Sequence, residues 1–257
     1  MTTAALLEAV DVSKRFGGIT ALDAVSLSVG AGEAVGLVGP NGAGKTTLFN
    51  CLLGLLRPDS GRIVFDGRDL VGLAVHRRAR LGIGRTFQRM ELFSELTVRE
   101  HLLVAERVRR GTGRLWKDLL NRGAPTAEEE AEVDTVLELV GLAPVADRAI
   151  ESLTLGHGRL VELARALMTR PRLLLLDEPS SGLDQAESLA LAGVLDTVRQ
   201  ERGTAVLLVE HDLAMVERVV ERLYVLDFGR LLASGGRDEV LADASVRKAY
   251  LGAEVGA

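Results

Sequence analysis

The sequence has 257 residues, of which 47% are hydrophobic and 26% are charged, and its formal net charge is −5. A chain of this length can bury a large core, and the negative balance argues against a general nucleic-acid-binding protein, which usually carries a basic face. The start of the chain lacks the basic residues of a signal peptide, no run reaches the ~18 apolar residues that cross a bilayer, and the single cysteine, Cys51, excludes a disulfide within the chain. We therefore expect a soluble cytoplasmic α/β protein.

Residues 6–12 and 20–29 alternate apolar and polar side chains, which predicts two half-buried antiparallel strands. Phe16 lies between them in a glycine-flanked turn. An aromatic ring there can stack on a flat ligand, or it can be an ordinary core residue under a turn. For this residue alone the two interpretations are equally favoured. The phosphate-binding loop that follows in the sequence, at residues 39–47, favours stacking on a base.

Residues 39–47 read Gly-Pro-Asn-Gly-Ala-Gly-Lys-Thr-Thr, which fits the pattern of a phosphate-binding loop. An apolar strand is expected before it, at residues 34–38, and a helix after it, at residues 47–53. The glycines let backbone N–H groups and the helix N-terminus converge on phosphate oxygens. Lys45 is expected to reach the β and γ phosphates, and the Thr46 hydroxyl to bind Mg²⁺. The residues predicted to hold the nucleotide are Gly39, Pro40, Asn41, Gly42, Ala43, Gly44, Lys45, Thr46 and Thr47.

The next stretch predicts a strand at residues 61–66, a short helix at 74–80 and a strand at 82–88. This last strand ends in Gln88, whose amide can reach Mg²⁺ or a water beside the γ-phosphate. A solvated strand end is the alternative for Gln88. From residue 90 to residue 141 the pattern becomes helical, and we expect a helical subdomain at residues 89–165.

Within that stretch, Thr97 and Glu100 have the spacing of a capping box, which predicts a helix over residues 97–110. An irregular connection is expected at 111–125, before a second helix that Thr126 opens. Four arginines are expected to form a solvated face, with contact to a partner or to anionic lipid as the less favoured alternative: Arg107, Arg109, Arg110 and Arg114.

A helix at residues 159–168 precedes four consecutive leucines at 173–176, which are typical of a strand buried on both faces of a parallel sheet. Asp177 and Glu178 follow directly, at the end of the strand where ligands bind in open α/β sheets. Asp177 is expected on the Mg²⁺ side, and Glu178 is placed to polarise an attacking water. A helix-capping acidic pair is the alternative.

Residues 181–184 form a predicted turn before a helix at 185–200, and an apolar strand at 204–209 leads to His211. A lone histidine is more often structural, but a strand end opposite a phosphate loop favours contact with the γ-phosphate and the attacking water. Two short strands within residues 222–235 and a helix at 244–250 complete the predicted elements.

With these residues in place, the chain resembles the ATP-binding subunit of an ABC transporter over residues 6–252. The resemblance implies a P-loop NTPase core with a mixed sheet, an antiparallel β-subdomain and a helical subdomain at 89–165, in one cassette. It identifies Lys45, Glu178 and His211 as catalytic and Thr46, Gln88 and Asp177 as Mg²⁺ ligands. In the family's terms, Phe16 is the base-stacking residue, residues 39–47 are Walker A, Gln88 is the Q-loop, 173–178 are Walker B, Asp184 belongs to the D-loop and His211 is the switch histidine.

One motif departs from the family. The signature Leu-Ser-Gly-Gly-Gln is replaced by Leu-Thr-Leu-Gly-His at residues 153–157. Thr154 keeps the hydroxyl and Gly156 keeps the glycine whose N–H approaches the γ-phosphate, whereas Leu155 and His157 differ. The change puts the ATP affinity of the signature side in question rather than the fold.

Residues 82–88, 92–100 and 249–252 look like those of branched-chain amino-acid importers. The ATPase of lipopolysaccharide export shares the last of these segments, and related importers carry urea or short amides. The resemblance implies ATP and Mg²⁺ as ligands and a place at the cytoplasmic face of the membrane. The implied partners are transmembrane permease subunits, a second ATPase subunit that is this chain or a paralogue, and indirectly a substrate-binding protein, with no nucleic acid.

Rival classes explain the sequence less well. DNA-repair ABC ATPases need a long coiled-coil insertion, and the stretch between Gln88 and Glu151 is too short for one. Translation factors of the family usually carry two cassettes, and a metabolic P-loop kinase leaves the signature, the D-loop and His211 unexplained. A transporter ATPase is therefore the function that the sequence predicts.

Overall fold

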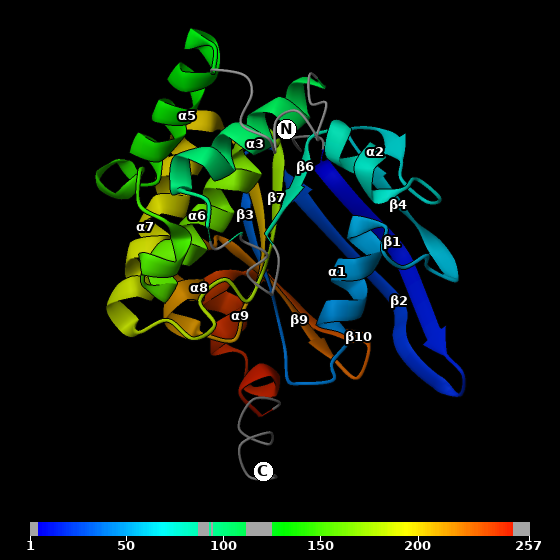
Figure 1. Cartoon of the computed structure of the whole chain (residues 1–257). Coiled ribbons are helices and arrows are strands. Elements are labelled where there is room, and N and C mark those ends of the chain that lie inside the picture. Colours follow the sequence, from blue (N-terminus) through cyan, green and yellow to red (C-terminus); the bar gives the residue numbers. More distant parts are fainter. Residues whose placement is uncertain (1–4, 87–92, 94, 112–124, 249–257) are drawn as a thin grey trace.

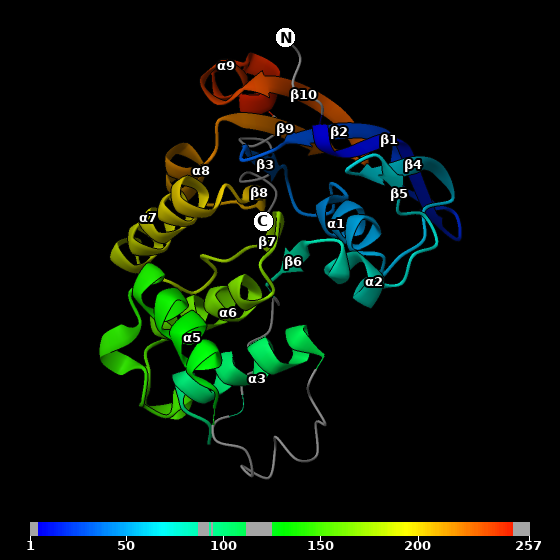
Figure 2. The same ribbon diagram turned by 90° about the horizontal axis from the view of Figure 1, so that it is seen from above.

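The computed structural model describes residues 5–86, 93, 95–111 and 125–248. Two β-sheets lie on one side of the molecule and a thick layer of helices on the other, with a helix between the sheets (Figures 1 and 2). The predicted α/β class, with a mixed sheet, an antiparallel sheet and helical segments, is confirmed.

The central sheet has six strands in the order β10-β9-β3-β8-β7-β6. Strands β6 to β9 and β3 pair in parallel, and β10 joins the edge in the antiparallel sense. Side chains of β7 and β8 alternate between two apolar clusters: Leu174 and Leu176 face one, Leu173 and Leu175 the other. Burial on both faces explains the uninterrupted apolar runs. The strands are β3 (Ala34–Val38), β6 (Ile83–Arg85), β7 (Leu173–Asp177), β8 (Ala205–Val209), β9 (Arg222–Asp227) and β10 (Arg230–Gly236).

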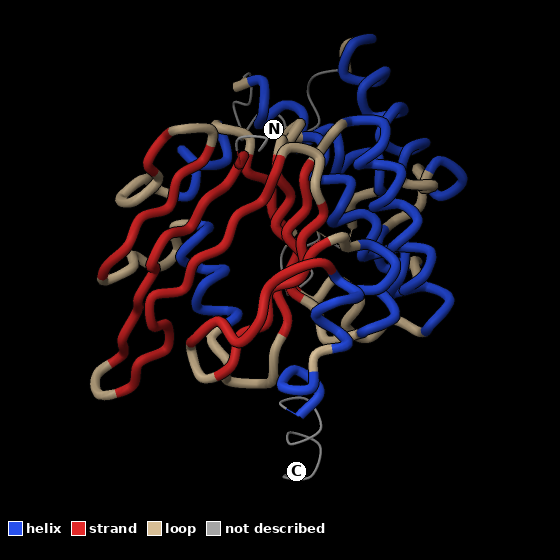
Figure 3. Tube along the Cα trace, turned by 180° about the vertical axis from the view of Figure 1, so that it is seen from behind, coloured by secondary structure: helices blue, strands red, loops and turns tan. Residues whose placement is uncertain are grey.

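The second sheet is antiparallel, with the order β2-β1-β4-β5. Its strands are β1 (Ala5–Phe16), β2 (Ile19–Gly30), β4 (Ser60–Phe65) and β5 (Arg68–Asp69). Helix α1 (Lys45–Leu53) lies between the two sheets, and its apolar side chains join both in one cluster (Figures 2 and 3). The sheets therefore fix the helix that follows the glycine-rich loop.

The remaining helices lie on the side of the central sheet opposite α1, some packed on the sheet and others on one another, apart from α2 (Val75–Arg80), which lies beside α1 (Figure 2). None of the helices in the described ranges is long and apolar enough to cross a membrane. The helices on that side are α3 (Val98–Arg110), α5 (Ala127–Leu139), η1 (Ala143–Val145), η2 (Ile150–Ser152), α6 (Leu155–Met168), α7 (Gln185–Arg202), α8 (Leu213–Val219) and α9 (Arg237–Ala242).

Most predicted elements are present, with errors at some of their ends. The capping box of Thr97 is confirmed, and Thr126 opens the second helix as predicted, with a capping box of its own that was not predicted. Helix α6 begins at Leu155 rather than at residue 159, because Thr154 caps it by accepting a hydrogen bond from the His157 N–H at 3.2 Å. The two glycines of this first turn suggested a loop. Helix α9 and the two-residue strand β5 were not predicted, residues 244–248 are helical, and residues 249–252 lie outside the described part. The subdomain boundary at 89–165 stays a prediction.

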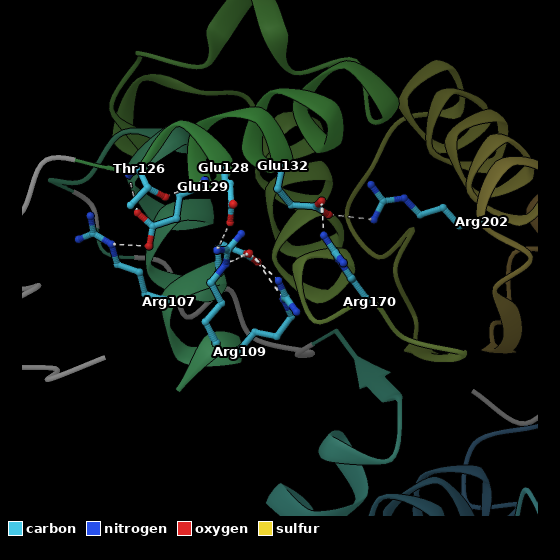
Figure 4. A network of polar contacts seen from close by, with 10 residues as sticks. Arg107, Arg109, Thr126, Glu128, Glu129, Glu132, Arg170 and Arg202 are labelled. Atoms are coloured by element: carbon cyan, nitrogen blue, oxygen red, sulfur yellow. Dashed lines mark hydrogen bonds and ion pairs between the residues drawn. The ribbon is translucent and has the colours of Figure 1, made fainter. Parts of the chain in front are cut away.

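Of the arginines expected on a solvated face, Arg109 is exposed as expected, whereas Arg107 and Arg110 are only partly exposed, and all three are held in ion pairs. Arg109 and Arg110 donate to the fully buried carboxylate of Glu106, and Arg107 pairs with Glu129 of α5 at 3.4 Å (Figure 4). The hydrogen bond from Arg109 holds the pKa of Glu106 below its usual value. A buried carboxylate needs such partners. Arg107 and Arg110 also join α3 to α5, through Glu129 and Glu128. Arg114 lies outside the described residues.

Candidate active site

The glycine-rich loop turns tightly between β3 and α1. Gly39 and Gly44 have φ angles of 149° and 104°. A Cβ at Gly39 would lie 2.2 Å from the Leu226 carbonyl oxygen, and one at Gly44 would lie 2.5 Å from the Ala21 carbonyl oxygen. Only glycine fits at these two positions, and the loop backbone can therefore lie close to Leu226 and Ala21. The loop leads directly into the N-terminus of α1, where backbone N–H groups can bind an anion.

The turn between β9 and β10 supports this loop from the side. The Gly229 N–H donates to the Ala43 carbonyl at 3.0 Å, and the Gly229 carbonyl accepts from the Asp23 N–H at 2.8 Å. One glycine thus links the antiparallel sheet, the glycine-rich loop and the last hairpin of the central sheet. Segments that are far apart in the sequence hold the loop in shape.

Lys45 is buried at the start of α1. Its ammonium donates to the carbonyl oxygens of Gly39 at 2.6 Å and Pro40 at 3.0 Å. Burial lowers the pKa of Lys45, while the negative charges of Glu178 and Asp177 act in the opposite direction. The charge is therefore held inside the loop and close to both carboxylates.

Asp177 and Glu178 stand at the carboxyl end of β7, as the sequence predicts. Burial, and after it the charge of Glu178, raises the pKa of Asp177 to about 6. Glu178 has a φ of 47°, which is unusual for a residue with a side chain. Its N–H donates to the Val209 carbonyl of β8 at 2.8 Å. The helix that follows is capped by Asp184, so the acidic pair is not a helix cap.

His211 follows β8, next to β7 in the sheet, and its ring is largely exposed. Its Nδ1 lies 3.9 Å from Oε1 of Glu178 and 3.9 Å from Oε2 of Glu210. The ends of β3, β7 and β8 thus gather a lysine, two acids and a histidine around the glycine-rich loop. This set can bind a phosphate and take a proton from a water beside it.

The donor set at this edge fits Mg²⁺. Asp177 is a half-buried carboxylate with a raised pKa, and the Thr46 side chain is exposed in the first turn of α1. Mg²⁺ prefers oxygen ligands and is usually held by one or two protein groups together with substrate phosphates. The described residues contain no group of three or more acids, histidines or cysteines that could hold a metal ion. Gln88 lies outside the described residues.

The other predicted residues lie around this centre. Phe16 ends β1 with 47% of its surface exposed, so the alternative of a core aromatic is wrong. Thr154, Gly156 and His157 form the first turn of α6, where the Thr154 hydroxyl bonds Nδ1 of His157 at 3.0 Å. A Cβ at Gly156 would meet Oε1 of Glu187 at 2.7 Å. Within one chain, the signature turn therefore packs against the start of α7, next to Asp184.

Two charged residues with clear structural roles were missed from the sequence. Glu210 is fully buried between the loops that carry Glu178 and His211. Arg78 of α2 is 2% exposed and donates to four backbone carbonyls. The available signal for Glu210 was its position directly after an apolar strand. Arg78 gave no such signal, because it lies among other arginines in a segment without a periodic pattern of apolar residues.

Gly44→Ala is expected to weaken ATP binding by about tenfold or more, since a new methyl group would push the backbone away from Ala21 just before Lys45. Titration with a fluorescent ATP analogue measures the change. Gly67→Ala is the matched control, because Gly67 has a φ of 75° but open space around its Cβ position. Equal losses of affinity in both variants would contradict the steric argument.

Comparison with known proteins agrees with this site. The family model for the ABC transporter domain matches residues 22–181. The chain is 41% identical to LivG of Salmonella typhimurium, named a high-affinity branched-chain amino acid transport ATP-binding protein, over 96% of this chain and 98% of that protein. BraF of Pseudomonas aeruginosa, which carries the same description, is 40% identical over 96% and 98%. LptB of Haemophilus influenzae, a lipopolysaccharide export ATP-binding protein, is 36% identical over 96% and 97%.

Solved structures give the same answer. An ATP-binding cassette of an ABC transporter in its ADP conformation superposes with a TM-score of 0.84 and 33% identity, covering 97% of this chain and 100% of that one. A dimeric cassette in a post-hydrolysis state, bound to ADP and phosphate, superposes with a TM-score of 0.73 and 26% identity, covering 90% and 98%. The family model and these relatives agree over nearly the whole chain, and this chain therefore belongs to the ABC transporter family, as one of its ATP-hydrolysing, ATP-binding subunits.

Proposed function

We propose that this chain hydrolyses ATP to power the uptake of branched-chain amino acids, bound to transmembrane permease subunits at the cytoplasmic face of a membrane. The observation that carries the proposal is the gathering of Lys45, Asp177, Glu178 and His211 at one sheet edge, in a chain 41% identical to LivG over nearly its whole length.

Each residue of the site has a proposed task. The loop at residues 39–47 and Lys45 bind the phosphates, and Phe16 stacks on the adenine. Glu178 accepts the proton of the attacking water, and His211 holds that water against the γ-phosphate. Thr46 and Asp177, with Gln88, would hold Mg²⁺, which neutralises charge on the phosphates when bound.

The signature segment acts on a second subunit in this proposal. Two subunits pair head to tail, and Thr154 and Gly156 of one close the ATP site of the other. The dimeric solved cassette, bound to ADP and phosphate, supports this arrangement. Hydrolysis removes the bridging phosphate, the dimer opens, and the motion is passed to the permease, with the stretch that follows Gln88 as the expected carrier.

The test is the ATPase rate of the complex reconstituted with the membrane subunits encoded beside this gene. Stimulation by leucine, isoleucine or valine, together with the matching binding protein, is the expected result. Basal hydrolysis with no response to these amino acids would contradict the substrate and direct attention to urea, amides or lipid export. A complex that hydrolyses no ATP would contradict the proposal as a whole.

A further inference from the structure

Glu210 is a buried carboxylate with partners in two loops. It follows β8 directly and is 0% exposed. Its Oε1 accepts from the Ser180 N–H at 2.9 Å and from the Ser180 hydroxyl at 2.5 Å. Its Oε2 accepts from the N–H groups of His211 at 3.0 Å and Asp212 at 3.3 Å. One side chain therefore holds the loop after β7 and the loop after β8.

The held loop contains Glu178 in a left-handed conformation. For a residue with a side chain, such a conformation costs of order 1–3 kcal/mol and persists only where the surroundings enforce it. On one side, the Glu178 N–H is bound to Val209 at 2.8 Å; on the other, the Glu178 carbonyl accepts from the Ser181 N–H at 3.1 Å. Ser180 lies between these two contacts in the sequence, and its N–H and hydroxyl donate to Glu210. Hydrogen bonds therefore hold the turn at residues 178, 180 and 181.

Among the ion pairs of the described residues, Glu210 has no arginine or lysine partner. Its ion-pair contact there is with Nδ1 of His211, at 3.9 Å. This differs from Glu106 and Glu33, which arginines neutralise. A buried carboxylate without a firm cation is stable only if donors surround it. Here those donors are three backbone N–H groups and the Ser180 hydroxyl, all from the loops that carry Glu178 and His211. The geometry of these loops and the burial of Glu210 therefore depend on each other.

We propose that Glu210 is a positioning residue for hydrolysis: it clamps the two loops and thereby sets the place of Glu178 relative to His211. The inference rests on the proposed function, because it concerns the same ATP site. It assigns no contact between Glu210 and ATP. The clamp serves the proton transfer from the attacking water, in which misplacement of the base slows the reaction without loosening the phosphate loop.

Glu210→Gln tests the clamp with almost no change in volume. The amide NH₂ faces N–H groups where a carboxylate oxygen accepted, so one loop loses its partner. We expect kcat to fall roughly 10–100-fold while the Kd for ATP stays within about twofold. Ser180→Ala removes one of the four donors and is expected to lower kcat less, and its effect should not add to that of Glu210→Gln.

Glu129→Gln is the matched control. Glu129 is also buried and accepts a backbone N–H, that of Thr126 at 2.9 Å (Figure 4), but it belongs to α5 and not to the loops after β7 and β8. Its kcat should equal that of the wild type even if its thermal midpoint falls.

Three readouts decide the outcome: kcat, the Kd for ATP and the thermal midpoint of each variant. An unchanged kcat in Glu210→Gln overturns the inference. A joint loss of kcat, ATP affinity and stability also overturns it, since that pattern indicates a structural role alone. If Glu210→Gln fails to fold, the same three readouts on Ser180→Ala decide whether the inference holds. An inactive wild-type protein would instead contradict the proposed function. An active wild type with an inactive Glu178→Gln keeps that function, and the variants of Glu210 and Ser180 then decide whether the clamp exists.

Discussion

Replacing Glu178 by Gln is expected to leave ATP binding intact and to lower turnover by roughly 10²–10⁴-fold, the contribution of a general base. The amide keeps the shape of the side chain but cannot take a proton from water. Because ATP then stays intact between subunits, the variant should also accumulate as a closed dimer with ATP and Mg²⁺. Phosphate release measures the rate, and gel filtration with and without ATP measures the dimer.

Glu138→Gln provides the control for this variant, since Glu138 is exposed on α5 and undergoes the same change of charge. It should hydrolyse ATP at the wild-type rate. Turnover near the wild-type rate in Glu178→Gln would remove Glu178 from the role of base and leave His211 as the group to examine.

The second large effect concerns stability and lies outside the ATP site. Arg78→Met is expected to lower the free energy of unfolding by about 3 kcal/mol, since it removes four hydrogen bonds and leaves the Leu52 and Leu73 carbonyls without their donor. The Arg78 guanidinium donates to Leu52 and Leu70 at 2.7 Å, to Cys51 at 2.9 Å and to Leu73 at 3.1 Å. The Cys51 and Leu52 carbonyls belong to the last turn of α1, where carbonyls lose their helical donors, although the Cys51 carbonyl also accepts from the Gly54 N–H at 3.2 Å.

Urea unfolding measures this change, with Arg77→Met as the control. Arg77 is the neighbouring residue of α2 and is exposed, so its replacement should alter the free energy of unfolding by only about 0.5 kcal/mol. Equal stabilities of the two variants would show that the Arg78 contacts contribute little to the folded state.

Local patterns were enough to predict the centre of the site. Strands β7 and β8 are short apolar runs that end in polar residues, and parallel strands bring such ends to one edge. Asp177, Glu178 and His211 could therefore be placed from the chain alone. The phosphate-binding loop could also be predicted, because the sequence before it is typical of a strand and the sequence after it is typical of a helix.

The residues that support the site could not be predicted in the same way. Arg77, Arg78 and Arg80 look alike in the sequence, and only the packing of α2 against the end of α1 buries Arg78. The role of Glu210 depends on Ser180, thirty residues away and adjacent only because β7 and β8 pair. The start of α6 was misplaced because glycines weaken a helical pattern, while the cap by Thr154 outweighs that weakness.

The contacts of Gly229 have a consequence for how the protein is made. Synthesis runs from the N-terminus, and the early parts of a chain can fold while the rest is still being added. The glycine-rich loop is complete by residue 47, yet one of its supports arrives more than 180 residues later, in the turn that bonds Ala43 and Asp23. A nascent chain halted before this hairpin would display every residue of the motif with one support of its loop missing. We therefore expect full nucleotide affinity only after this hairpin has been made, late in translation.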